Sequence, residues 1–382
     1  MRSAQKLEQH LKQSNIPGME TCLKLWPRTP KSQLLRLGVE QIQQFLFAEE
    51  VVAGADCEKW FAHYFQYCKV SSDFTNSQKL QKYIYDNHIY PSWDIFGAAT
   101  GRIITRKPAI NSTPRAAVFR NMFRALEHHD FIICDYSMIE IVIIAVISND
   151  QTMLQNLYDH KDLHIFLAAQ VLNKPYEQLM ALKQTNPSEY KKIRNPMKAV
   201  NFGLLYGMGV ETLWKRFISL GYNYTKEEVR HIHKVWTDTY SGIARYKILC
   251  QQQIQMQIPS ALYVPNSCNA ITSVRGRVAQ QTDAMTSTYN FPIQATCADI
   301  LKTALRIFML AKQKHLFCED ILVILTAHDE IVFQCPQEKT EITKQQVQLI
   351  LLEAAHKILK PIQPLISCGV EIGVGQSWAD KP

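Results

Sequence analysis

Two groups of acidic residues stand at the ends of apolar runs, where they could hold a metal ion. Asp135 follows the run Phe131–Cys134, and Asp329 with Glu330 separates two apolar runs within 321–335. Short, dense apolar runs predict buried strands, and the second pair predicts a β-hairpin with the carboxylates at its tip. Carboxylate oxygens that converge from two strands of one sheet suit Mg²⁺, and two such ions about 4 Å apart can stabilise both oxygens of a phosphoryl displacement. Either acid alone is better explained by a strand end or a polar turn.

A second candidate site lies on the segment 194–207, with the sequence RNPMKAVNFGLLYG. Asn195 suits an N-cap, Pro196 the first helical position and Gly207 the C-terminal cap, so the segment predicts a helix over about 196–206. Three residues recur every fourth position on one broad face: Lys198, Phe202 and Tyr206. A cation near a helix N-terminus suits phosphates, and an aromatic ring can stack on a base or sugar. Taken alone, the segment is better explained as an amphipathic helix with a solvated lysine and core aromatics.

The elements that must position these side chains differ along the chain. Residues 1–93 show helical periodicity, which breaks at Pro91 to Trp93, so a boundary is expected there. Residues 150–258 are also mostly helical, and four breaks interrupt them: Pro175, Pro187, Pro196 and the turn Gly221–Asn223. Strands separated by a long helical insertion predict an α+β arrangement.

The composition is that of a folded protein without a membrane span. The 382 residues are 47% hydrophobic and 20% charged, which excludes a largely disordered chain and allows two or three domains. The longest apolar run, Ile141–Ile147, is too short to cross a bilayer, and no apolar leader opens the chain. The ten cysteines form no CxxC pair, which favours reduced thiols, and the net charge of +8 suits a polyanionic partner.

The separate motifs together resemble one family. Residues 135–140 (DYSMIE) resemble motif A (DYSQIE) of the family A DNA polymerases, the polymerase I family, segment 194–207 resembles its motif B, and residues 328–333 (HDEIVF) resemble its motif C (HDELVF). Four more segments resemble the family in order: 100–114 (TGR…PAINSTP), 161–164 (KDLH), 292–300 (PIQ…ADI) and 370–378. The resemblance runs from residue 97 to 380, about three quarters of the chain.

The resemblance implies a right-hand polymerase fold of the α+β class. Its parts would be a reduced helical thumb at 1–93, a palm built from 94–149 and 286–382 around an antiparallel sheet, and helical fingers at 150–285. Too few residues precede the palm for a 3′–5′ exonuclease domain, so no proofreading is expected.

The resemblance also implies two sets of ligands for metal and nucleotide. Asp135 and Asp329 would hold two Mg²⁺ ions, with Mn²⁺ as an alternative ion, the backbone carbonyl of Tyr136 as a further ligand and Glu330 beside them. The nucleotide residues fall into two groups: Lys198, Arg194 and His164 at the triphosphate, and Phe202 and Tyr206 at the sugar and nascent base pair.

The remaining implied roles concern sugar choice and DNA. Glu140 would crowd the 2′ position of the sugar. Arg102, Asn290 and Gln294 would contact the minor groove of the primer–template, and His328 the primer terminus.

Several positions depart from the family's usual residues. Pro196 disfavours helical geometry at Asn195, which would leave Arg194 at the mouth of the helix rather than on the Lys198 face. Val142 and Thr286 stand where the family usually has arginines. The resemblance therefore predicts a weakened grip on DNA.

The function expected from these motifs is DNA-templated DNA synthesis from dNTPs. A metal-dependent nuclease or transposase would use the same acids but needs no triphosphate helix, and a catalytically inactive nucleic-acid-binding module would not need both metal carboxylates. Single-subunit RNA polymerases share the palm, but Glu140 and Phe202 favour DNA. The protein is expected to be a monomer that acts in the cytoplasm, either associated with the nucleoid or as a viral or mobile-element protein in its host. No membrane partner is expected. A separate clamp, primase or exonuclease could assist it.

Overall fold

The structure, a computed structural model, divides the chain into two compact units. It describes residues 3–38, 42, 55–98, 100–255, 285–317, 319–364, 366 and 368–381. One unit comprises Met1–Lys82 with Met208–Arg230, and the other comprises Tyr83–Gly207 with His231–Pro382. The expected thumb, fingers and palm boundaries divide the chain differently and stay a prediction.

Helices build the first unit: α1 (Ala4–Gln13), α2 (Met19–Leu25), α4 (Ala55–Gln81) and α11 (Val210–Ser219). Leu7 and Leu11 of α1 share a core with Trp26 and with Phe61 of α4, whose ring centroid lies 5.2 Å from that of Trp26. From residue 65 to 81, every side chain of α4 is at least partly exposed. Hydrophobic burial therefore anchors only the N-terminal part of this long helix.

Two short hairpins begin the second unit. They are β1 (Ile84–Tyr85) with β2 (His88–Ile89), and β3 (Ser92–Asp94) with β4 (Ile104–Arg106). Asp86 and Asn87 turn the first hairpin with positive φ angles of 47° and 58°, a conformation that Asp and Asn tolerate in two-residue turns. The expectation of helix throughout 1–93 is therefore wrong for its last ten residues, because turn chemistry overrides the periodicity there.

The central sheet of the second unit has four antiparallel strands in the order β6-β7-β5-β8. Their bounds are β5 (His129–Ser137), β6 (Leu322–Ala327), β7 (Glu330–Pro336) and β8 (Gly369–Gly375). The predicted strand and hairpin are confirmed, with two shifts. Asp135 lies inside β5 rather than after it, and Glu330 opens β7 instead of sitting at the tip. The register places Asp135 opposite Glu330 on one side and Glu371 on the other.

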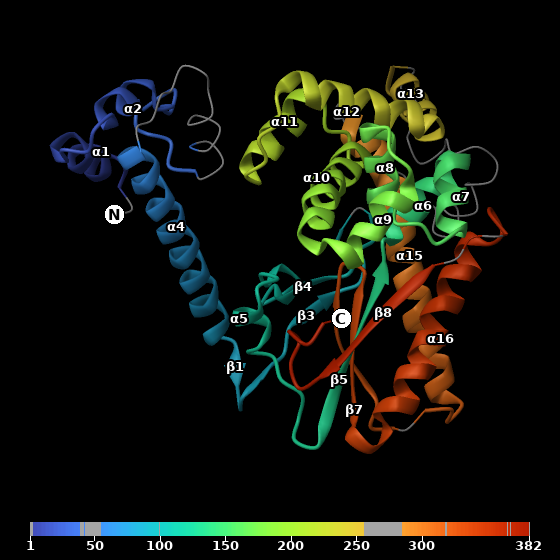
Figure 1. The fold of residues 1–382 in the computed structure, drawn as a ribbon. Helices are drawn as coiled ribbons and strands as arrows, with labels where there is room; N and C mark the ends of the chain where they lie inside the picture. Colours follow the sequence, from blue (N-terminus) through green and yellow to red (C-terminus); the bar gives the residue numbers. More distant parts are fainter. Residues whose placement is uncertain are drawn as a thin grey trace. The chain divides into compact units, whose positions relative to one another are not determined.

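The two faces of the sheet have different partners. Tyr136 faces α16 (Thr340–Leu359), where its hydroxyl donates to the Leu351 carbonyl at 2.8 Å. Phe131 and Ile133 pack with Trp378 on the opposite face. Because side chains alternate along a strand, Asp135 lies on the Trp378 face, away from α16. Figure 1 shows α16 and α15 (Met285–Gln313) alongside the strands.

Helix α6 (Ile139–Ser148) ends the first part of the expected palm. Besides α11 of the first unit, these helices fill the expected fingers region: α7 (Gln151–Tyr158), α8 (Leu163–Leu172), α9 (Tyr176–Thr185), α10 (Pro187–Leu205), α12 (Lys226–Thr239) and α13 (Ser241–Gln255). Asp150 caps α7 and also accepts hydrogen bonds from the backbone N–H groups of Gly242 and Ile243 at 2.8 and 3.2 Å. A Cβ on Gly242 would lie 2.6 Å from the Asp150 Cα, so this approach of α13 requires glycine. Three short elements complete the unit: α5 (Ala117–Arg120) and the 3₁₀ turns η1 (Ile110–Ser112) and η3 (Gln337–Lys339).

Helix α10 corrects the prediction for motif B. The helix begins at Pro187, with the Asn186 side chain accepting from the Glu189 N–H at 3.2 Å, and it includes Pro196 in its interior. The expected start at Pro196 is therefore wrong, and so is the expected position of Arg194 at the helix mouth. A proline inside a helix removes one hydrogen bond and costs about 3 kcal/mol, which the buried apolar face of α10 offsets. Gly207, with φ of 82°, ends the helix as predicted.

Two further findings concern the described parts of the chain. None of the helices in these parts is both long and apolar enough to cross a membrane. The eight cysteines described are all free thiols, and seven of them are buried.

Candidate active site

Lys381, which follows strand β8 in the sequence, lies between two acids of the central sheet, Asp135 and Glu330. Lys381 Nζ lies 2.7 Å from Asp135 Oδ2, and the same ammonium group pairs with Glu330. The other oxygen of Asp135, Oδ1, is buried and has no hydrogen-bond partner. An unpartnered buried carboxylate oxygen is costly unless it binds a cation or a donor. Asp135 therefore keeps one oxygen available as a ligand.

Asp329 lies in the turn between β6 and β7, directly after His328, whose φ of 60° is left-handed. Burial and the negative charge of nearby Asp135 together raise the pKa of Asp329 to about 6. Burial and the neighbouring carboxylate therefore disfavour the ionised form of Asp329, and the positive charge of Lys381 offsets only part of this effect. A divalent cation between the two carboxylates would reverse this effect.

The donor set fits a hard divalent cation. Asp135 and Asp329 supply only oxygen ligands, and one of these oxygens is buried without a partner. In the described ranges, no three His, Cys, Asp or Glu side chains are grouped so that they could hold a metal ion. Further ligands would have to come from backbone carbonyls, such as that of Tyr136, or from a bound substrate. Two carboxylates completed by substrate oxygens are typical of Mg²⁺ sites.

Glu330 belongs to a buried network behind Asp135. It accepts from Arg120 at 3.3 Å and from the Trp378 indole, and the Arg120 guanidinium lies 4.2 Å from the centroid of the Trp378 ring. Glu330 and Arg120 are both almost completely buried. The sequence expectation placed Glu330 near the site, but it did not find Arg120 or Lys381. These residues lie far from motifs A and C in sequence, and no local pattern marks them.

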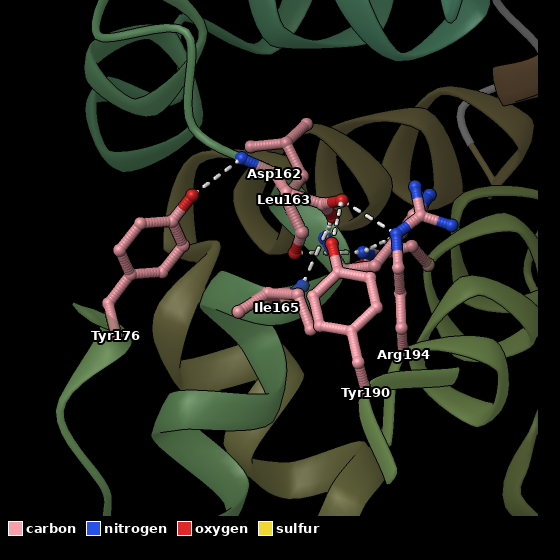
Figure 2. A network of polar contacts seen from close by, with 8 residues as sticks. Asp162, Leu163, Ile165, Tyr176, Tyr190 and Arg194 are labelled. Atoms are coloured by element: carbon pink, nitrogen blue, oxygen red, sulfur yellow. Dashed lines mark hydrogen bonds and ion pairs between the residues drawn. The ribbon is translucent and has the colours of Figure 1, made fainter. Parts of the chain in front are cut away.

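A second cluster joins α8 and α10 through Asp162. Asp162 caps α8 by accepting from the His164 and Ile165 N–H groups at 2.9 and 3.2 Å, and it also accepts from Arg194 Nε at 2.6 Å and the Tyr190 hydroxyl at 3.2 Å. Burial alone would raise the pKa of Asp162, but the hydrogen bond and charge of Arg194 lower it overall. Figure 2 shows the two terminal nitrogens of Arg194 pointing away from Asp162. The ion pair therefore fixes Arg194 while leaving these nitrogens directed elsewhere.

Helix α10 carries the predicted side chains on its less buried face. Lys198 is exposed, whereas Phe202 and Tyr206 are half-buried. The opposite face is buried and apolar, with Met197, Val200 and Leu204. Because Arg194 is inside the helix, it lies one turn before Lys198 on this same face. The two cations and two rings thus follow one another along α10.

His164 lies behind this face. Its side chain is buried, and its ring centroid is 6.0 Å from that of Phe202. Burial and the charge of Arg194 together lower the pKa of His164 to about 4. His164 is therefore neutral near pH 7, so it could contact a phosphate only as a neutral hydrogen-bond donor.

Three of the residues expected at the sugar and DNA, Glu140, Arg102 and His328, lie near the carboxylates. Glu140, in the first turn of α6, forms an ion pair of 2.7 Å with Arg102, whose Nε is buried without a hydrogen bond. Burial lowers the pKa of His328, and the charge of Arg102 contributes. Asn290 and Gln294 are one turn apart on α15, and they are the only partly exposed residues between 289 and 300. Both could therefore reach a ligand over the same face of α15.

Val142 and Thr286 are the two positions at which the family usually has arginines. Val142 is 2% exposed and belongs to the apolar core. The side chain of Thr286 lies outside the described residues.

Comparison with known proteins assigns the family. The sequence model of DNA polymerase family A matches residues 41–380. The chain is 28% identical over 303 residues to DNA polymerase I of Aquifex aeolicus, covering 79% of this chain and 48% of that protein. It is 30% identical over 292 residues to DNA polymerase I of Deinococcus radiodurans, covering 74% and 27%. The chain thus spans half or less of the length of these relatives.

A solved structure shows the same fold. The POL domain of Pol1 from M. smegmatis, in complex with DNA primer-template and dNTP, matches with a TM-score of 0.71 at 20% identity, covering 100% of this chain and 64% of that one. The fold is therefore the α+β fold of a polymerase domain. The chain belongs to DNA polymerase family A.

Proposed function

We propose that this chain is a DNA-directed DNA polymerase that joins a deoxynucleotide to a primer 3′ hydroxyl with release of pyrophosphate. The observation that carries the proposal is the pair of acids Asp135 and Asp329 on adjoining parts of one sheet, with the unpartnered Oδ1 of Asp135 and the raised pKa of Asp329. Family membership supports it, because the relatives named above are DNA polymerases.

In this proposal, Asp135 and Asp329 hold two divalent ions, Mg²⁺ or Mn²⁺. When bound, such ions stabilise charge on the attacking and leaving oxygens of phosphoryl transfer. Ions held by Asp135 would compete with Lys381 for the charge of that carboxylate, while Glu330 would keep Arg120 and Trp378 as partners.

The residues on α10 bind the nucleotide. Lys198 and the terminal nitrogens of Arg194 attract the triphosphate, and the Asp162 contact keeps Arg194 from rotating away. Phe202 packs on the sugar and base, and Tyr206 lines the new base pair. Catalysis is then mostly positioning and electrostatic stabilisation.

Sugar choice and DNA contacts come from the residues near the carboxylates. Glu140 occupies the space that a 2′ hydroxyl would need. Arg102, Asn290 and Gln294 contact the primer–template, and His328 lies at the primer end. The polyanionic partner suits the net charge of +8.

We also propose that residues 1–382 do not proofread by themselves. The described part of 1–82 forms helices around an apolar core, and two of its acids, Glu8 and Glu20, form ion pairs with neighbouring cations. A labelled primer with a 3′ mismatch should therefore keep its terminal nucleotide when the purified chain is added without dNTPs.

The test is a primer-extension assay with a labelled primer on a defined template. Extension with dNTPs and Mg²⁺, loss of extension with EDTA and little extension with NTPs are the expected results. Degradation of the primer–template in Mg²⁺ without extension would instead identify a nuclease. Binding of DNA with neither reaction would identify an inactive binding module.

A further inference from the structure

We propose that Asn201 and Trp236 are positioning residues that fix the tautomer of His164, with its single proton on Nε2. They would thereby make His164 a neutral hydrogen-bond donor next to the cations of α10. The proposal deepens the proposed function, because the acceptor of this donor would be an oxygen of the bound triphosphate. The tautomer itself can be tested without any polymerase reaction.

The orientation of the Asn201 amide is fixed by Trp236 of α12. Trp236 Nε1 lies 2.9 Å from Asn201 Oδ1. An indole N–H can only donate, so the oxygen of the amide, and not its nitrogen, must face Trp236. The amide nitrogen then faces α8, where it lies 3.2 Å from the Leu163 carbonyl. A carbonyl can only accept, so this second contact requires the same orientation.

This orientation determines where His164 carries its proton. Asn201 Nδ2 also lies 2.9 Å from His164 Nδ1. Since Nδ2 is a donor, Nδ1 must be the acceptor, and a neutral imidazole then has its proton on Nε2. A proton on Nδ1 would set two N–H groups against each other in a buried place. His164, Asn201 and Trp236 are only 1%, 1% and 2% exposed, so water cannot relieve that conflict.

The charged groups around His164 agree with a neutral ring. Burial, Arg194 and Lys198 lower its pKa, and Asp162 raises it, with a net result of about 4. The neutral ring with an Nε2 proton would add a hydrogen bond to an anion held by the cations of α10. The other tautomer would present a lone pair at Nε2 and repel phosphate oxygens. The Asn201 amide therefore decides whether His164 attracts or repels the triphosphate.

The first test is the protonation state of His164 by ¹⁵N NMR of histidine-labelled full-length chain at pH 7, without DNA or nucleotide. The chain has 12 histidines, so His164→Gln identifies the resonance by its disappearance. The expected result is a neutral ring protonated at Nε2. A ring protonated at Nδ1, or an imidazolium, would overturn the proposal whatever the activity of the protein.

The second test changes the partner and leaves His164 in place. Asn201→Asp replaces the donor by an acceptor of nearly the same shape, so His164 should take up a proton on Nδ1. Trp236→Phe removes the indole N–H and allows the amide to turn, so a mixture of tautomers is expected. Asn173→Asp is the matched control, because Asn173 is an exposed position at the end of α8, the helix that carries His164, and the charge change is identical.

A third test measures KM and kcat for dNTP, to determine whether the tautomer of His164 affects nucleotide binding. With extension active, Asn201→Asp should raise the KM for dNTP by about tenfold and change kcat by less than about threefold, while Asn173→Asp leaves both near the parent values. An altered tautomer with unchanged KM would overturn the link between His164 and the triphosphate. A parent chain without extension would refute the proposed function but leave the NMR result to decide the tautomer. The parent NMR spectrum also decides the proposal if Asn201→Asp fails to fold.

Discussion

Arg102 Nη2 lies 2.7 Å from Glu140 Oε1. This ion pair joins the first turn of α6 to a residue that stands more than thirty positions earlier in the sequence. Both side chains are about a quarter exposed. The ion pair restricts the Glu140 carboxylate to one position, and a restricted side chain excludes a ligand atom better than a mobile one. The same guanidinium also contributes to the lowered pKa of His328. Arg102 therefore links Glu140, the residue proposed for sugar choice, to His328, the residue proposed at the primer end.

We expect Glu140→Ala to admit ribonucleotides. Without the carboxylate, a 2′ hydroxyl no longer clashes, so the preference for dNTP over NTP should fall by at least about tenfold, while dNTP use falls only modestly. Single-nucleotide incorporation kinetics measure the preference. A variant that keeps the parent's preference within about threefold, or about 0.7 kcal/mol, would show that Glu140 is not the gate.

Arg102→Gln tests the contribution of the ion pair to this gate. It should lower the sugar preference less than Glu140→Ala does, because Glu140 remains but is no longer held. Arg106→Gln is the control, since it breaks an exposed pair with Asp94 at 3.3 Å. Equal effects of the Arg102 and Arg106 substitutions would contradict a specific role for Arg102.

Asp135→Asn and Asp329→Asn should each abolish extension and largely preserve DNA binding. Each substitution removes a charge that the metal ions need, whereas the fold loses no buried apolar contact. Primer extension and gel-shift titration provide the two measurements. Glu127→Gln, at an exposed position before β5, is the control and should extend normally. Extension above a few per cent of the parent rate by either aspartate variant would refute the assignment.

Phe202→Tyr should increase the use of dideoxynucleotides. The parent ring has no hydroxyl that could replace the hydrogen bond of a missing 3′ hydroxyl, so the parent should discriminate against such terminators. The ratio of termination to extension in a primer-extension ladder measures the effect. Phe74→Tyr adds a hydroxyl at a position that is 62% exposed on α4 and should change nothing. Identical ladders from the parent and Phe202→Tyr would place Phe202 away from the sugar.

Lys381→Met should strengthen metal binding while weakening the metal-free protein. The Lys381 ammonium group neutralises Asp135 and Glu330, so it competes with a divalent cation and stabilises the fold without one. Thermal unfolding at increasing Mg²⁺ should show a lower starting Tm and half-maximal stabilisation at about threefold less Mg²⁺. A variant with the parent's Mg²⁺ dependence would show that Lys381 does not compete for the site.

We expect the free energy of unfolding to depend on pH because of the buried side chain of Lys247. Its Nζ donates to the Leu204 carbonyl at the end of α10 and lies 4.8 Å from the Trp236 ring, and burial lowers the pKa of Lys247 to about 8 from 10.5. Between these pH values the unfolded chain binds more protons than the folded chain, so the free energy of unfolding should rise with pH by up to about 1.4 kcal/mol per unit. Lys247→Met should lose this rise.

Urea unfolding at pH 7.5, 9 and 10 measures the effect as the difference between the parent and the variant, because other groups also titrate in this range. The exposed Lys234→Met is the control and should keep the parent's pH response. If Lys247→Met and the parent respond alike to pH, Lys247 does not titrate with a lowered pKa.

The sequence by itself determined the elements whose signals are local. The apolar runs around Asp135 and Asp329 gave the central strands, because a buried strand is recognised by its own residues. The spacing of Lys198, Phe202 and Tyr206 gave their common helix face, because helical geometry fixes it. Where two local signals competed, the sequence misled: Pro196 suggested a helix start, but the cap at Asn186 and the buried apolar face of α10 extend the helix through it.

Only the tertiary structure decided which distant side chains meet. Lys381 and Asp135 are 246 positions apart, and Asn201 lies 35 positions from Trp236 and 37 from His164. Such contacts depend on strand register and helix packing, which result from many weak interactions across the whole unit. The local sequence around each residue therefore does not indicate its distant partner. The chemistry of the site was therefore readable from residue types, whereas its charge balance and its hydrogen-bond directions depend on the fold.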